Sequence, residues 1–541
     1  MLSIAMLRTR VVFPLAALLP IACSNTYEAD EPTGRPSANA LRATNDGEGC
    51  SRTLDSDAQL RRAIDDAFAF AAMRLRETVR ALMAAYPADY ATYYPTHTFI
   101  SGPQVGQWDF RPASRPQISS RVQDWRSGFF PGALWLVHHE HPRARDLLEF
   151  ARAWTAGIEA IKDVPIDHDI GFRFRSSFGQ ALRLTRPADD PSGGYRAHAR
   201  EVLLEAARTL DTRFDQGGIP VGAIRAEDDY PPAGPYPVYV DSMMNVPLLF
   251  EAAQLRGRRS AEARRWYEHG VTHATTVMRD NVRDDGSTYH IARYRDGTFG
   301  TPPDGRLYDK ISDQGYGNET TWSRGQAWAI YGFALVHRFT RHDPRAETAR
   351  FLRTAERAAD YFLAHLPAND ADPFNHREGD FVPPSDFDAS RGEPPGPYND
   401  ANGDHVYGDR KPPTRAFTER DSSAAAIAAR GLLELSELAR EPSKRERYRR
   451  GARDILRSLL TFRGPDGNLL YLAKDPSPHR GLLANGSVAW GSGTNSLIYG
   501  DYYLLEAMSR YRAAAAAAAA HHCDCDCERE GERDDNGDDP P

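Results

Sequence analysis

The sequence contains little cysteine and has no long apolar run beyond its N-terminal segment. Only five of the 541 residues are cysteine, and three of these lie in the tail, at Cys523, Cys525 and Cys527. The other two are Cys23 and Cys50, so we expect a fold without disulfide bonds. No stretch after residue 22 is long and apolar enough to cross a membrane as a helix. These absences exclude a disulfide scaffold and a protein with several membrane spans.

The chain also lacks a net positive charge. The formal net charge is −8, and residues 523–541 hold nine acidic residues against two arginines. The tail therefore carries most of the negative charge, and the remaining chain is close to neutral. A protein whose main partner is nucleic acid usually has a strong basic field. We therefore expect no nucleic-acid partner.

The first 23 residues have the pattern of an export signal. Arg8 and Arg10 precede an apolar run at 11–22, which is too short for a permanent span but suits a signal peptide. The sequence LPIAC resembles a bacterial lipoprotein box, in which Cys23 would carry the lipid anchor. Simple cleavage is the alternative. We expect a signal peptide at 1–22 and an exported protein, periplasmic or anchored in the outer membrane as a lipoprotein.

The two flanks of the chain read differently from its middle. Residues 23–54 are polar and rich in turn formers, which predicts a linker. Residues 513–541 begin with eight alanines and continue as a Cys-rich acidic run. Within that run HHCDCDC resembles a soft metal-binding tract. Such compositions rarely pack, so we interpret the tail as a disordered appendage.

Helical periodicity fills the middle of the chain, and strand patterns are nearly absent. Two classes of helix alternate along it. One class starts at polar or aromatic clusters and continues with small or apolar residues, which predicts interior helices. These are 127–140, 169–186, 242–256, 322–340, 421–438 and 495–512. The other class carries more Arg and Glu, which predicts half-solvated helices; these are 57–84, 145–162, 193–213, 260–279, 345–366 and 443–462.

Strict alternation of interior and exterior helices is what a closed ring of helical hairpins requires. We therefore predict an all-α fold, an (α/α)6 barrel of six hairpins over residues 55–512. All interior helices of such a barrel run in one direction, so their starting clusters should meet at one end. The long connections 281–320 and 367–420 should form walls there.

Two acidic residues open interior helices. Asp241 precedes the apolar sequence SMMNVPLLF, and Asp169 follows His168 in DHDIGFRF, with Phe172 one turn later. Such carboxylates could share proton transfer. An aspartate at a helix start is also a favoured cap, because its oxygen accepts the free N–H groups of the first turn. Both interpretations remain open for each residue.

Aromatic and cationic side chains accompany these acids. Sugar rings stack on flat aromatic faces, and Trp125 and Trp135 offer such faces in DWRSGFFPGALW, although an aromatic core is the commoner use. Arg324 stands among aromatic residues in WSRGQAW. A buried Arg needs an anion, which could be a ligand or a neighbouring Asp, so both partners remain possible.

Six motifs in a fixed order resemble the unsaturated glucuronyl hydrolases, glycoside hydrolase family 88. They are WRSGFFPGALW, HDIGFRF, DSMMNVPLL, TTWSRGQAWAIYGFA, RDSSAAAIAA and SLIYGDYYLLEA, and the match spans about residues 60–512. The resemblance implies an (α/α)6 barrel that removes the Δ4,5-unsaturated uronic acid from the non-reducing end of lyase-generated oligosaccharides. It implies no metal and no organic cofactor. The 367–420 insertion and the tail depart from the family pattern.

The resemblance also assigns residues. It implies that Asp241 is the general acid and base, and that Asp169 is its essential partner. The family reaction is a hydration, in which the acid protonates C4 of the vinyl ether, water adds at C5, and the hemiketal opens. Arg324 is similar to the residue that meets the uronate carboxylate. The remaining positions that match the substrate pocket are His168, Phe172, His290, Gln314 and Trp322, with Trp125 or Trp135 from the first aromatic motif.

Three other functions fit parts of the pattern. The unsaturated rhamnogalacturonyl hydrolases share the fold and chemistry, but DSMMN followed by WSRGQAW is more similar to the glucuronyl family. An (α/α)6 sugar epimerase or isomerase would be expected to use a histidine pair, while the clusters here supply Asp, Arg and Trp. A non-catalytic glycan-binding lipoprotein would bind without turnover.

Overall fold

The computed structural model describes residues 48–113, 124–228, 235–257, 259–370, 376–389, 419–474 and 476–531. The chain divides into two units, Met1–Leu54 and Asp55–Pro541, and the barrel belongs to the second. Several predicted features lie outside the described residues: the signal peptide at 1–22, Cys23, most of the 23–54 linker, most of the 367–420 connection and the end of the tail. Within the described part, we find no helix with the length and apolarity that a membrane span needs.

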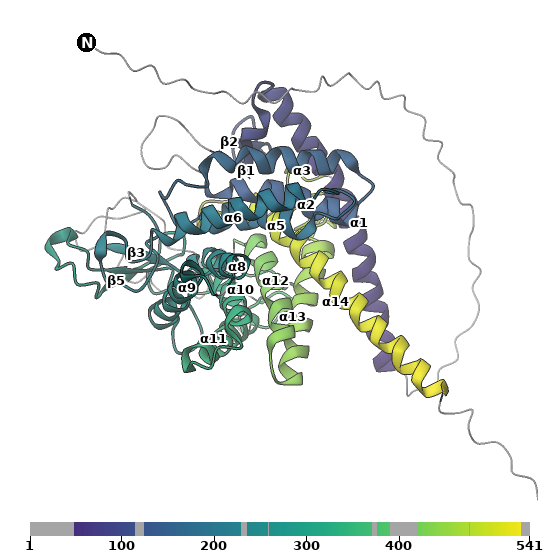
Figure 1. Ribbon diagram of the computed structural model, residues 1–541. Helices are drawn as coiled ribbons and strands as arrows, with labels where there is room; N and C mark the ends of the chain where they lie inside the picture. The colour runs from purple at the N-terminus through teal and green to yellow at the C-terminus, as the bar shows by residue number, and fades with distance from the viewer. Residues whose placement is uncertain are drawn as a thin grey trace, which may run out of the picture. The chain divides into compact units, whose positions relative to one another are not determined.

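The contacts among the interior helices of the described residues close a ring; Figure 1 labels α2, α5, α8, α10, α12 and α14 of this set. Helix α2 contacts α4 and α5, α4 contacts α7, α7 contacts α10, α10 contacts α12, α12 contacts α14, and α14 returns to α2. Their bounds are α2 Phe129–Glu140, α4 Ile170–Ser176, α5 Phe178–Leu184, α7 Ser242–Asn245, α8 Pro247–Arg256, α10 Ser323–Thr340, α12 Ser422–Leu438 and α14 Ile498–Gly531. Their side chains supply much of one continuous apolar core.

A second set of helices packs outside this ring, each against its neighbour in sequence. Helix α3 packs on α2, α6 on α5, α9 on α8, α11 on α10 and α13 on α12. The bounds are α1 Glu48–Ala85, α3 Arg145–Gly157, α6 Gly194–Asp211, α9 Ala261–Asp280, α11 Ala346–Ala364 and α13 Pro442–Thr461. Helix α1 joins α14 through Tyr511, which donates to Asp57. The prediction of an (α/α)6 barrel is confirmed.

Two of the predicted interior helices are each broken into two pieces. The third interior helix changes from α7 to α8 at Val246 and Pro247, because Pro247 has no N–H to continue the hydrogen-bond ladder. The second changes from α4 to α5 at Ser177. Both reactive-acid candidates therefore lie on short N-terminal pieces.

Small sheets, which the sequence analysis did not predict, lie between the helices. The pair β1 (Tyr93–Thr98) and β2 (Trp108–Pro112) is antiparallel, as is the pair β6 (Gly486–Ser487) and β7 (Thr494–Asn495). A three-stranded antiparallel sheet has the order β3 (Tyr236–Tyr239), β4 (Ile291–Tyr294) and β5 (Leu307–Ile311). Short 3-10 turns complete the structure: η1 Tyr90–Thr92, η2 Trp125–Gly128, η3 Glu159–Ile161, η4 Gln216–Gly218 and η5 Thr298–Gly300.

Two helices run past the ends of the predicted domain at 55–512, although the second compact unit itself begins at Asp55. Helix α1 begins at Glu48, inside the predicted linker, because no Gly or Pro interrupts the chain between Gly49 and Pro87. Helix α14 continues to Gly531, although we predicted disorder from residue 513. The reason is the run of eight alanines, since alanine is the strongest helix former.

Candidate functional site

The β3–β4–β5 sheet delivers three predicted site residues to one place. Strand β3 ends at Tyr239, two residues before Asp241. Strand β4 begins directly after His290, and β5 ends shortly before Gln314. The strands pair with Tyr239 opposite Ile291 and Ile291 opposite Ile311, and the N–H of Val240 donates to the carbonyl of His290 at 2.9 Å. Residues from three separate sequence segments therefore meet at the start of α7.

Neither candidate acid caps its helix. Asp169 occupies the N-cap position of α4 and Asp241 that of α7, yet neither side chain accepts a hydrogen bond from its helix. Asp124 and Asp421 provide a comparison, because each accepts from a backbone N–H two residues later. The cap interpretation is therefore wrong for Asp169 and Asp241. Their carboxyl groups are left for other work.

Asp241 lies buried beside a neutral histidine. Its Oδ2 is 3.6 Å from Nε2 of His290, and both atoms are buried and have no hydrogen-bond partner among the described residues. Nδ1 of His290 accepts from the N–H of Asp313 at 3.1 Å, which leaves the proton of the ring on Nε2. Burial lowers the pKa of His290 to about 3. Burial raises the pKa of Asp241 to about 7, and Arg324 opposes that rise.

Asp169 faces the same place from α4. Its Oδ1 accepts from the side-chain amide of Asn245 at 3.2 Å and lies 3.4 Å from Nε2 of His168. Asn245 stands on α7, four residues after Asp241, so the two acids are joined through one short helix. Burial raises the pKa of Asp169 well above its ordinary value, and the charges of Asp167 and Asp241 raise it further. Burial is also the largest cause of the raised pKa of Asp241, and the neighbouring charge that raises it further is Asp313.

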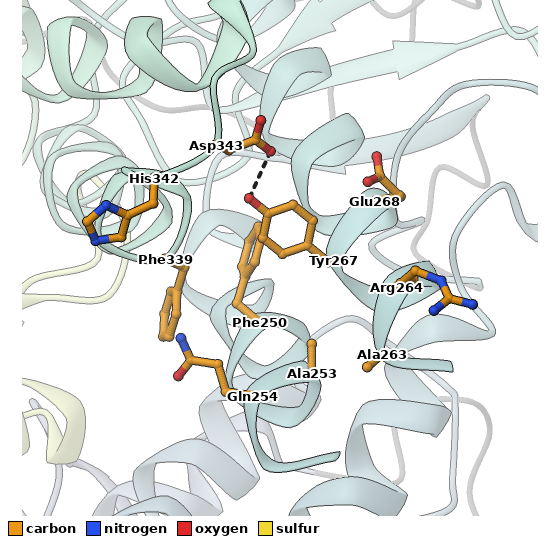
Figure 2. A pocket seen from close by; sticks show the side chains of 10 residues that line it. All are labelled: Phe250, Ala253, Gln254, Ala263, Arg264, Tyr267, Glu268, Phe339, His342 and Asp343. Carbon is orange, nitrogen blue, oxygen red and sulfur yellow. Dashed lines mark hydrogen bonds between the residues drawn. The ribbon is translucent and has the colours of Figure 1, made fainter. Parts of the chain in front are cut away.

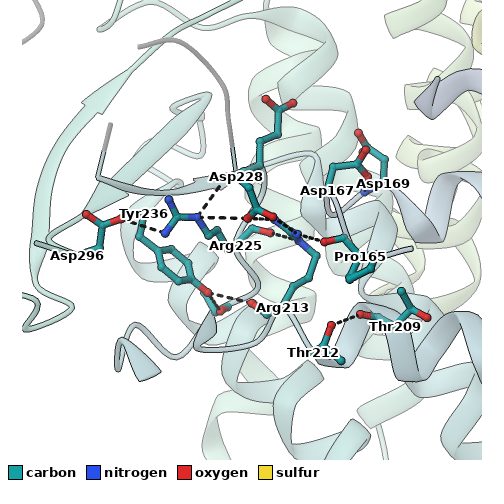
Figure 3. Close-up of polar contacts among 12 residues, drawn as sticks. Pro165, Asp167, Asp169, Thr209, Thr212, Arg213, Arg225, Asp228, Tyr236 and Asp296 are labelled. Atoms are coloured by element: carbon teal, nitrogen blue, oxygen red, sulfur yellow. Dashed lines mark hydrogen bonds and ion pairs between the residues drawn. The ribbon is translucent and has the colours of Figure 1, made fainter. Parts of the chain in front are cut away.

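Hydrogen bonds from Arg213 and to Ala226 hold the loop before Asp169 (Figure 3). Arg213 donates to the backbone carbonyl of Pro165 and pairs with Asp228 at 3.0 Å. His168 donates its backbone N–H to Ala226 at 2.8 Å. Burial also lowers the pKa of His168 to about 3, so this imidazole is neutral.

Aromatic rings connect the acids to the other predicted residues. The ring of Tyr239 contacts those of His168 and His290, at centroid distances of 5.5 and 5.3 Å. Trp322 lies 4.5 Å from His290. Phe172 contacts Trp125 at 5.4 Å. Trp322 Nε1 is buried without a hydrogen-bond partner among the described residues, as are Nδ1 of His168 and Nε1 of Trp328.

Arg324 also lies at this place, but its terminal nitrogens are occupied. Nη1 donates to Asp421 at 2.9 Å and to the carbonyl of Ser487. Nη2 donates to Oε1 of Gln314 at 2.5 Å and to the carbonyl of Val488. The guanidinium carbon lies 4.4 Å from the ring centre of Trp322. Of the two partners left open by the sequence, the structure shows the neighbouring aspartate.

One predicted residue is not part of the cluster. Trp135 is fully buried, and its indole N–H donates to Thr155 at 2.9 Å. Its ring packs against Tyr195 at 5.8 Å. Trp135 stands near the middle of α2, about 15 Å along the chain direction from Trp125. The prediction that Trp135 binds substrate is therefore wrong, and Trp125, which is half-buried, is the tryptophan of that motif in the cluster.

The sequence analysis missed three contributors. Tyr239 stands two residues before Asp241, and residues two apart on a strand share a face. Asn245 stands four residues after Asp241, which is the spacing of neighbours on a helix. Asp167 accepts the backbone N–H of Asp169 at 2.8 Å. The first two spacings were available as signals.

One cavity lies apart from this cluster. A cavity of about 250 Å³ lies between α8, α9 and the end of α10, where Phe250 and Phe339 stack and Tyr267 donates to Asp343 (Figure 2). It contains none of the predicted site residues. Among the described residues, no group of three or more His, Cys, Asp or Glu side chains is arranged to hold a metal ion.

Comparisons with known proteins agree on one group of relatives. The chain is 30% identical over 402 residues to the unsaturated glucuronyl hydrolase of Formosa agariphila, which covers 73% of this chain and 82% of the relative. It is 30% identical over 398 residues to the unsaturated glucuronyl hydrolase of Bacillus sp. (strain GL1), with 72% and 86% covered. A crystal structure of an unsaturated glucuronyl hydrolase specific for heparin matches with a TM-score of 0.61 and 27% identity, over 85% of this chain and 98% of its own. No protein-family model matches the chain.

Proposed function

Because this chain belongs to the unsaturated glucuronyl hydrolases, we propose that Asp241 is its general acid and base and that Asp169 is the partner of that acid. The protein is a glycoside hydrolase that removes the Δ4,5-unsaturated uronic acid from the non-reducing end of lyase-generated oligosaccharides. Membership of this family decides against the sugar isomerase, although His168 and His290 do form a histidine pair around Tyr239. What remains to be assigned is the work of each side chain.

One observation carries the role of Asp241. A buried carboxyl whose pKa is about 7 holds its proton near neutral pH, and its Oδ2 has no competing hydrogen bond among the described residues. A general acid of this reaction needs both properties, since the proton must be present when substrate arrives and must be free to leave. The apolar start of α7 supplies them through burial.

The reaction then follows in three steps. Asp241 gives its proton to C4 of the vinyl ether, which leaves positive charge at C5 shared with the ring oxygen. Water adds at C5 and returns a proton to Asp241, so the carboxyl is regenerated. The hemiketal opens, and the glycosidic oxygen leaves with the shortened oligosaccharide. The Nε2–H of His290, 3.6 Å from Asp241, is placed to hold that water or the developing carboxylate.

Asp169 has a different task in this scheme. Burial raises its pKa well above the ordinary value, and the charges of Asp167, Glu227 and Asp241 add to that rise, which favours a protonated carboxyl that donates a hydrogen bond to a substrate hydroxyl. Asn245 holds one of its oxygens, which orients the other. A raised pKa at both acids also reduces their repulsion of a substrate that itself carries a uronate charge.

The uronate carboxylate meets Gln314 and the field of Arg324. Oε1 of Gln314 accepts from Arg324, which leaves the two N–H donors of the amide for the substrate. The four N–H groups of the terminal nitrogens of Arg324 have protein acceptors, so Arg324 orients Gln314 and contributes charge from behind. Trp125 and Phe172 provide the apolar faces for the sugar ring.

The test is the loss of the unsaturated chromophore when lyase-generated disaccharides from several acidic polysaccharides are added. We expect Asp241→Asn to fold and to leave the chromophore intact. Asp501→Asn is the matched control, because Asp501 is also buried with a pKa raised to about 7, but it accepts from the backbone of Leu482 and Leu483. Turnover by Asp241→Asn at the rate of the control would falsify the assignment.

We also propose that the protein is exported and anchored through Cys23. Support comes from Arg8 and Arg10, the apolar run at 11–22 and the sequence LPIAC. Expression with a labelled fatty acid should give a labelled protein, and Cys23→Ser should abolish the label. A full-length product without label in the presence of intact Cys23 would leave simple cleavage as the explanation.

A further inference from the structure

Asp167 occupies a special place beside the acid cluster. Its Oδ1 accepts the backbone N–H of Asp169 at 2.8 Å, and its Oδ2 accepts from Nη2 of Arg173. We propose that Asp167 is a positioning residue of the hydrolysis, which, together with Arg173, fixes Asp169 at the start of α4. This inference rests on the proposed function and adds a residue to it, because Asp167 itself does not touch the substrate.

These contacts connect the loop before Asp169 to helix α4 through both the backbone and the side chain of Arg173. Arg173 donates its backbone N–H to the carbonyl of Asp169 at 3.0 Å, while its side chain reaches back to Asp167. The Arg173 side chain is fully buried, and its Nε and Nη1 have no hydrogen-bond partner among the described residues. A buried guanidinium is costly without an anion, so Arg173 depends on Asp167. Asp169 is thereby held at both its N–H and its carbonyl.

Asp167 is itself fixed by a second layer of contacts. The backbone of Asp167 forms an isolated antiparallel β-bridge with that of Glu227. Arg213 donates to the carbonyl of Pro165 and also to the carboxylate of Asp228. Figure 3 shows Asp167 and Asp169 next to each other, with Arg213 reaching Pro165 from the side of Asp228. Asp228 thus supports the same loop without contacting Asp169 in any recorded hydrogen bond.

The charges around Asp169 explain why the contacts of Asp167 and Arg173 affect its protonation. The charged and titratable groups that face Asp169 are Asp167 and His168 from its own loop, Arg173 from α4, Glu227 from the neighbouring loop and Asp241 from α7. The guanidinium of Arg173 lies near two carboxyl groups: it donates to Asp167, and its charge also acts on Asp169.

Arg173 is paired with Asp167, and the pKa of Asp167 is lowered despite the opposing effect of burial, which is the largest single influence. Asp169 has no such pairing, and its pKa is raised by burial and then by Asp167. These contacts therefore lower the pKa of Asp167 and leave that of Asp169 raised, although Arg173 also acts to lower the latter. Removing the charge of Asp167 frees Arg173 to pair with Asp169, which would then ionise.

The experiment compares Asp167→Asn with Asp228→Asn. The first keeps an oxygen that accepts the N–H of Asp169 but removes the charge, and the second removes a neighbouring ion pair of the same loop. We expect kcat/KM of Asp167→Asn at pH 7 to fall by about tenfold, because an ionised Asp169 no longer donates to the substrate hydroxyl; a tenfold change corresponds to one pKa unit. The deficit should shrink as the pH is lowered, because Asp169 regains its proton. Asp228→Asn should keep the kcat/KM and the pH profile of the wild type.

Two results would overturn the role of Asp167. A folded Asp167→Asn with the wild-type pH profile overturns the inference, as does an equal loss in Asp228→Asn. If Asp167→Asn does not fold, the double variant Asp167→Asn/Arg173→Gln removes the unpaired guanidinium. No freed cation is then left to ionise Asp169, so this variant should regain the wild-type pH profile, and a profile that stays shifted overturns the inference. Asp241→Asn separates the two proposals: its inactivity together with a normal Asp167→Asn refutes only the role of Asp167.

Discussion

Replacing Gly171 by alanine should separate the two acids. Gly171 lies on α4, two residues after Asp169, and faces Asn245 of the short helix that Asp241 opens. A Cβ at this position would lie 2.4 Å from Cα of Asn245 and 2.6 Å from its carbonyl oxygen. Both are backbone atoms, so no side-chain rotation can relieve the contact, and the helices themselves have to move.

The size of the movement sets the size of the effect. Ordinary van der Waals contact begins at 3.4 Å, which is 1.0 Å more than 2.4 Å, so α4 and α7 must part by about that distance. A misplacement of about 1 Å in a catalytic arrangement can cost about 100-fold in rate. Overpacking costs about 1–3 kcal/mol, offset by about 1 kcal/mol because alanine favours the helix more than glycine does. We therefore expect a large loss of kcat with a stability loss of about 0–2 kcal/mol.

The assay is the initial rate of chromophore loss at saturating substrate, together with urea unfolding. Gly179→Ala is the control. Gly179 lies on the neighbouring helix α5, and the nearest atom to a Cβ at this position would be Cγ of Arg175 at 3.6 Å. It should keep kcat and gain up to about 1 kcal/mol of stability. A Gly171→Ala enzyme with undiminished kcat would show that the separation of Asp169 and Asp241 does not limit the reaction.

Three further predictions follow from the cluster and its surroundings. The pKa of Asp241 is raised to about 7, so kcat should fall about tenfold for each pH unit above 7 as the proton is lost. The contribution of Asp241 to the free energy of unfolding should decrease as the pH rises from its ordinary pKa to about 7. Measurements of kcat and of urea unfolding over a pH series check both. Arg324→Met leaves Asp421 buried without its cation and should cost about 3–5 kcal/mol in urea unfolding, part of which Arg324→Met/Asp421→Asn should restore. Trp135→Phe should lower stability by about 1–3 kcal/mol with KM unchanged, whereas Trp125→Ala should raise KM; equal KM values for the two variants would contradict the placement of these rings.

The architecture could be predicted from the sequence because its signal is repeated. Interior helices such as α10 and α12 are buried on nearly all sides, and their partners α11 and α13 carry a polar face, so periodicity and composition agree in each hairpin. The order of these two classes fixed the ring. It also placed the N-termini of the interior helices, and with them Asp169, Asp241 and Arg324, at one end.

The rest depended on contacts that a pattern does not contain. The strand β3 has four residues, too few for an alternation to stand out, yet it sets the position of Asp241. Arg324 was open to two partners, and only coordinates show that Asp421 and two backbone carbonyls occupy it. Trp135 belongs to the same motif as Trp125, and its place in the core follows from the rotation and rise of α2.

The contact between α2 and α14 has a consequence for synthesis of the chain. Trp125, in the turn η2 that precedes the first interior helix, contacts Tyr499, in the last interior helix, at a ring-centroid distance of 5.0 Å. A chain emerging from the ribosome can form hairpins one after another, but its earliest interior helix waits with an open edge until the latest one arrives. A chain that stops before α14 therefore lacks both the Trp125–Tyr499 contact and the last interior helix of the ring.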